Sequence, residues 1–85
     1  MSASRRERIA AAESACLASL HQQPDYIAAK QSADELEAKV KAARADSQHA
    51  MLATLSQQWI DAKNKLAKME ADALAADPDV RAAKN

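Results

Sequence analysis

The chain has 85 residues, with twelve basic and twelve acidic side chains and a formal net charge of zero at pH 7. A chain this short forms one small domain at most, and its even charge disfavours the basic stripe that nucleic-acid binding requires. Hydrophobic residues make up 48% of the sequence, but many of them are alanine, so the apolar core is thin.

The composition predicts an all-α fold in a single small helical domain covering residues 1–85. The sequence contains no glycine and two prolines, so turns that need a positive φ angle are costly, while the abundant Ala, Lys, Glu, Gln and Leu favour helix. No apolar run is long enough to span a membrane, and the single cysteine cannot form an internal disulfide. We therefore expect a cytoplasmic protein, or one assembled from the cytoplasm into a particle such as a virion.

The first predicted helix covers residues 3–22. Ser2 or Ser4 can cap it, and Glu7 follows Ser4 at the spacing of a capping box. Pro24 ends this helix, because the residue before a proline avoids the α conformation. The apolar stripe of this helix consists of Ile9, Ala12, Cys16, Leu17 and Leu20.

The segment that follows Pro24 is predicted to form one long helix over residues 25–76. Its apolar positions fall in one helical sector on both sides of Asp46 and Ser47, and this part of the chain lacks the usual turn formers Gly, Pro and Asn. The first helix would then pack antiparallel on the long one as a helical hairpin. The alternative is a turn at residues 45–48, with Asp46 and Ser47 capping a new helix, which would give a three-helix bundle.

A short C-terminal helix is predicted over residues 78–84. Proline is favoured at the first helical position, and Pro78 repeats the arrangement found at Pro24. The stretches PDYIAAKQ and PDVRAAKN share five of eight residues. We interpret the similarity as the same helix-start chemistry used twice, with a degenerate internal repeat as the alternative.

A continuous second helix would be about 75 Å long and the first about 30 Å, so much of the apolar stripe would lack cover. Such a stripe is typical of an interaction site. Trp59 would be its anchor, since tryptophan is enriched at binding hot spots, and a core role for Trp59 in a three-helix bundle is the alternative. The predicted protein interface consists of Leu52, Leu55, Trp59, Ile60, Leu66 and Met69.

No residue pattern points to catalysis, a cofactor or a metal. Cys16 and His21 are five residues apart and His49 is distant, so they lack the spacing of a zinc site. Cys16 is interpreted as a small buried apolar residue. Asp46 and His49 have no nucleophile or oxyanion loop beside them, and we interpret them as solvated.

Arg5, Arg6 and Arg8 form a local basic cluster. It is a candidate electrostatic contact for an acidic protein surface, and a solvated first helical turn is the alternative. Glu7 interrupts the cluster and no aromatic residue is near it for base stacking, so nucleic acid is a disfavoured partner.

These features predict a non-enzymatic structural or assembly protein. It would dock through an apolar helix face into a multi-subunit complex, with a protein partner or further copies of itself and no membrane contact. In architecture alone it resembles small helical components of phage virions and bacterial assemblies. The alternative is a small soluble regulator or inhibitor that occludes a protein partner with the same face.

Overall fold

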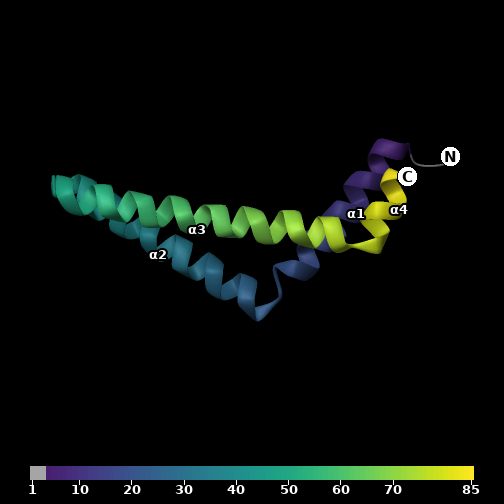
Figure 1. Ribbon diagram of the computed structural model, residues 1–85, viewed down its shortest axis with the longest axis horizontal. Helices are drawn as coiled ribbons and strands as arrows, with labels where there is room; N and C mark the ends of the chain where they lie inside the picture. Colours follow the sequence, from purple (N-terminus) through teal and green to yellow (C-terminus); the bar gives the residue numbers. More distant parts are fainter. Residues whose placement is uncertain (1–3) are drawn as a thin grey trace.

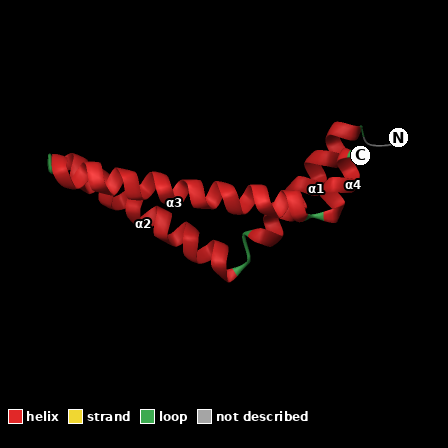
Figure 2. Ribbon diagram, viewed as in Figure 1, coloured by secondary structure: helices red, strands yellow, loops and turns green. Residues whose placement is uncertain are grey.

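The computed structural model describes residues 4–85, and over this range the chain forms four helices and no strand. The helices are α1 (Arg5–Leu20), α2 (Pro24–Ala45), α3 (His49–Ala76) and α4 (Pro78–Lys84) (Figures 1 and 2). The predicted all-α class is confirmed. The proposed Ser2 cap and a helix start at residue 3 lie outside the described residues.

The molecule is elongated, with principal extents of 57 × 24 × 17 Å. Its radius of gyration is 17.4 Å, against about 12 Å for a compact chain of this length. Figure 1 shows why: α2 pairs with most of the length of α3, while α1 and α4 lie together beyond the start of α2. The chain therefore has two small packing regions joined by α3.

The single long helix predicted over residues 25–76 is wrong, because the chain reverses between Ala45 and His49. Helix α2 ends in a Schellman motif, in which the Gln48 amide donates to the Ala43 carbonyl at 3.0 Å and the Ser47 amide to the Arg44 carbonyl at 3.3 Å. These bonds satisfy carbonyls that the helix end would otherwise leave without partners.

Ser47 occupies the left-handed position of this motif, with a φ angle of 57°. Glycine is usual there, so a chain without glycine did not suggest a reversal. Serine is among the residues that favour turns, and the hydrogen bonds of the motif compensate for its unfavourable conformation. The turn anticipated as the alternative at residues 45–48 is the one that forms, and the helical hairpin is built from α2 and α3.

A regular seam joins α2 to α3. Its apolar residues recur at alternating intervals of three and four, the spacing typical of coiled coils. On α2 the seam consists of Tyr26, Ala29, Ala33, Leu36, Val40 and Ala43. On α3 it consists of Leu52, Leu55, Trp59, Ala62, Leu66, Met69 and Ala73. All the α2 seam residues except Leu36 are buried, whereas no residue of α3 is.

The second packing region brings α1 against α4 and the end of α3. Val80 of α4 is 1% exposed and is one of the most deeply buried side chains, and Cys16 and Leu20 are the buried residues of α1. Asp77 caps α4 by accepting from the Asp79 and Val80 amides at 2.8 and 3.1 Å. The predicted helix over residues 78–84 is confirmed, but α1 does not lie along the whole hairpin, so no three-helix bundle forms.

The predicted capping box at the start of α1 is also confirmed. The Glu7 amide donates to the Ser4 hydroxyl at 3.2 Å, and the Ser4 amide donates to the Glu7 carboxylate at 3.4 Å. Both bonds satisfy amides that the first helical turn leaves free. The local sequence thus sets where α1 begins.

Replacing Ser47 with glycine should raise the free energy of unfolding by roughly 0.5–1 kcal/mol, because glycine adopts a positive φ without a steric penalty. Urea denaturation followed by circular dichroism measures the change. Ser14→Gly, at an exposed site within α1, is the matched control and should lower stability by a similar amount. A loss of stability in Ser47→Gly would contradict the left-handed turn.

Candidate interaction surface

Five of the six residues predicted to form an interface belong to the α3 seam and face α2. Each of these five side chains is half-buried: Leu52, Leu55, Trp59, Leu66 and Met69. These side chains share one apolar face that has a partner within the chain over part of its width, and the role of that face as an interface stays a prediction. A single helix covers only part of an apolar sector this wide, which leaves the flanks of α3 accessible.

Trp59 lies near the middle of the hairpin. Counting outward from the turn places it opposite Leu36, in the layer that follows Val40 and Leu55. The Lys63 ammonium nitrogen lies 4.7 Å from the centre of a Trp59 ring, within cation–π distance. The indole is half-buried, so it packs in the hairpin and also keeps an accessible edge.

Ile60, the sixth predicted residue, points away from the seam and is 48% exposed. It belongs to a second apolar row on the flank of α3, at intervals of seven residues. This row, called the outer strip below, consists of Ala53, Ile60, Ala67 and Leu74. The two alanines are exposed and Leu74 is half-buried. A spacing of seven drifts by only about 20° per repeat, so the outer strip runs nearly straight along the helix.

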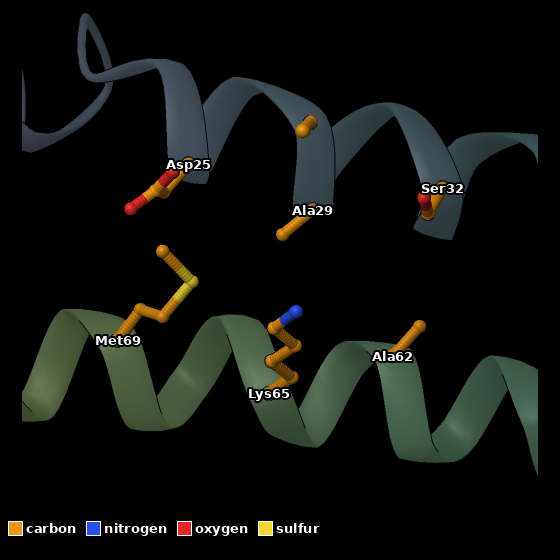
Figure 3. A pocket seen from close by; sticks show the side chains of 7 residues that line it. Asp25, Ala29, Ser32, Ala62, Lys65 and Met69 are labelled. Atoms are coloured by element: carbon orange, nitrogen blue, oxygen red, sulfur yellow. The ribbon is translucent and has the colours of Figure 1, made fainter.

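A groove of about 430 Å³ lies between α2 and α3 near the start of α2 (Figure 3). Its lining residues are Asp25, Ala28, Ala29, Ser32, Ala62, Lys65 and Met69. Figure 1 shows α2 diverging from α3 toward Pro24, and the small seam residues Ala29 and Ala62 do not fill the widening space. Sequence reasoning missed this groove, although alanine on both facing helices was the available signal.

A polar cluster closes the same end of the hairpin. The Tyr26 hydroxyl donates to Glu70 Oε1 at 2.9 Å, and His21 Nε2 lies 3.6 Å from the same oxygen. The His21 and Tyr26 rings stack with their centroids 4.7 Å apart. Burial raises the pKa of the Tyr26 hydroxyl, and the Glu70 carboxylate raises it further. The cluster links α2 to α3 at the end of the hairpin opposite the turn, and sequence reasoning did not predict it.

The candidate metal ligands and reactive groups are dispersed. Within residues 4–85 no group of three or more His, Cys, Asp and Glu side chains could hold a metal ion. Cys16 is buried, as predicted, with its sulfur 3.5 Å from the Ala73 carbonyl oxygen. Burial and the nearby Asp77 raise the pKa of its thiol, so little of the reactive thiolate is present at neutral pH. Asp46 and His49 flank the turn and are exposed.

The arginine cluster lies at the end of the molecule where α1 meets α4. Arg5, Arg6 and Arg8 are exposed, and the Arg5 guanidinium donates to the Lys84 carbonyl. The Lys84 ammonium in turn lies 3.8 Å from a Glu13 carboxylate oxygen. The cluster therefore adjoins a further cation and is far from the α2–α3 turn (Figure 1).

No protein-family model, curated protein or solved structure matches the chain. Among the described residues, no helix combines the length and the apolar character needed to cross a membrane.

We expect Tyr26→Phe to lower the free energy of unfolding by about 1 kcal/mol at pH 7, because the hydrogen bond to Glu70 is lost. The raised pKa of Tyr26 stabilises the fold below the ordinary tyrosine value of about 10, and this contribution is lost as the pH rises through the higher folded value. The difference between wild type and Tyr26→Phe should therefore shrink above about pH 10.

Urea titrations at neutral and alkaline pH measure this difference. Glu70→Gln is the control, because it retains a hydrogen-bond acceptor and removes the charge. A double-mutant cycle with Tyr26→Phe then separates the contribution of the Glu70 charge from that of the hydrogen bond. Equal stability of Tyr26→Phe and wild type at pH 7 would show that the bond contributes nothing beyond what water provides.

Proposed function

We propose that this chain is a non-enzymatic structural protein that docks through the apolar flank of α3 into a multi-subunit complex. The observation that carries the proposal is the exposure of α3, which has 28 residues, none of them buried, despite its Leu, Ile, Met and Trp side chains. A small protein that leaves its largest apolar residues partly in water gains stability when a partner covers them.

The arrangement of the hairpin supports this role. Helix α2 holds α3 along one face, so the flank that carries Ile60 is presented on a helix whose position is already set. A surface ordered before binding loses less conformational entropy on association than a flexible one. The turn at Ser47 and the cluster around Tyr26 hold the two ends of that hairpin.

Exposure supports a ranking of the six proposed contact residues. Ile60 and the accessible edge of Trp59 are the best placed, since Leu52, Leu55, Leu66 and Met69 also hold α2. The proposed interface still comprises all six, with those four contributing their exposed edges. Arg5, Arg6 and Arg8 stay a predicted electrostatic contact for an acidic protein surface.

A photo-crosslinking amino acid placed at position 60, in cells that produce the protein naturally, tests the proposal. We expect a discrete crosslinked product, because this position lies on the docking flank. The same amino acid at Lys68, an exposed position on a different face of α3, is the control and should give little product. Equal crosslinking at both positions, or none at 60, would contradict the proposal.

Two substitutions separate docking from folding. Ile60→Ser should reduce the yield of the assembled complex while changing the free energy of unfolding by no more than about 0.5 kcal/mol, since Ile60 is largely exposed. Trp59→Ala should reduce both, because the indole packs in the seam and truncating a half-buried aromatic removes apolar contacts. Sedimentation of the complex and thermal melts of the isolated chain measure the two effects. Loss of assembly in neither variant would contradict the assignment.

A further inference from the structure

We propose that the outer strip of α3 binds the outer strip of a second copy of this chain, forming a two-fold symmetric antiparallel dimer. This inference rests on the proposed use of α3 as an assembly face and names the partner. A two-fold interface uses the same patch on both subunits, so the patch must complement itself when one copy is reversed.

The surface area of the chain fits such a partner. It exposes 6215 Å², whereas a compact monomer of its mass, 9.1 kDa, exposes about 4,900 Å². The excess comes from the elongated shape of the whole chain, and an interface that removed it from both copies would bury about 2,600 Å² in total, within the range of obligate homodimers. A formal net charge of zero also means that two copies carry no overall repulsion.

The side chains of the outer strip complement themselves when the symmetry axis passes near Ala67. The alanine on the axis allows the two helices to approach closely. Ile60 and Leu74 lie seven residues before and after it, so antiparallel packing brings Ile60 of each copy to Leu74 of the other. The largest side chains of the strip then meet in two equivalent contacts, at equal distances from the axis.

The charges beside the strip agree with this alignment. Lys63 and Glu70 lie about one helical turn on either side of Ala67, so the reversed copy brings each lysine to the other copy's glutamate, twice. Both contacts of Glu70 within the chain use Oε1, and 38% of its side-chain surface is accessible, so Oε2 can accept from a lysine across the interface.

Sedimentation equilibrium of the purified chain tests the dimer. We expect the wild type to dimerise, and Ile60→Lys to raise the dissociation constant about thirtyfold or more, because it places a charge in an apolar contact. Met51→Lys is the matched control: it also replaces an exposed apolar residue of α3 with lysine, at a side chain that is 55% exposed on the opposite face of the helix from Ile60, and should leave the constant unchanged. Circular dichroism checks that each variant is folded.

Cysteine crosslinking tests the antiparallel alignment. In a Cys16→Ala background, Ala67→Cys should form a disulfide-linked dimer under mild oxidation, because the two thiols meet at the axis. Ala53→Cys, the same change elsewhere on the strip, should not form one, since its symmetry mate is far away. Crosslinking through position 53 but not 67 would overturn the alignment.

A wild-type chain that stays monomeric, or a dimer that Ile60→Lys leaves intact, would overturn the inference. A failure of the dimer can be distinguished from a failure of the proposed docking function. If the chain is monomeric in isolation but position 60 crosslinks to a different protein in cells, docking through α3 stands and self-association does not.

Discussion

The packing of a small-residue helix face against a large-residue one underlies the rest of this structure. Half of the α2 seam residues are alanine, and the α2 seam is buried against α3, whereas the leucines, methionine and tryptophan of α3 are too wide for one narrow helix to cover. The same mismatch leaves the groove near Met69 and the exposed flank around Ile60. The hairpin that stabilises the monomer thus also creates its candidate interaction surface.

Much of the local structure could be predicted because it depends on neighbouring residues. Pro24 and Pro78 start α2 and α4, Ser4 caps α1, and Cys16 is buried as its apolar neighbours suggested. The reversal at Ser47 could not be predicted from the absence of glycine, because the backbone hydrogen bonds of the turn make a left-handed serine tolerable. A subtler signal existed: the regular three-and-four spacing stops at Ala43 and resumes at Leu52, nine residues later.

The sequence could predict which side chains share the apolar face of the candidate site, but it could not predict which residues contact that face. A helical pattern assigns Trp59 and Leu66 to one apolar sector, but it does not reveal that another segment of the chain occupies the centre of that sector. That depends on the direction of α2, which the turn determines. For the same reason Ile60, at the margin of the sector, is the most exposed of the six residues, and the Tyr26–Glu70 bond, which joins distant segments, was not foreseen.

The antiparallel contact of α1 with α4 brings the beginning of α1 beside the end of the chain, at the pole opposite the α2–α3 turn (Figure 1). A tether attached at Arg5 or at the end of α4 would therefore hold the molecule by one pole, with the hairpin extending away from it. Mechanical tension between these two points would load the α1–α4 contact first and separate the helices around Val80, while α2 and α3 remained paired.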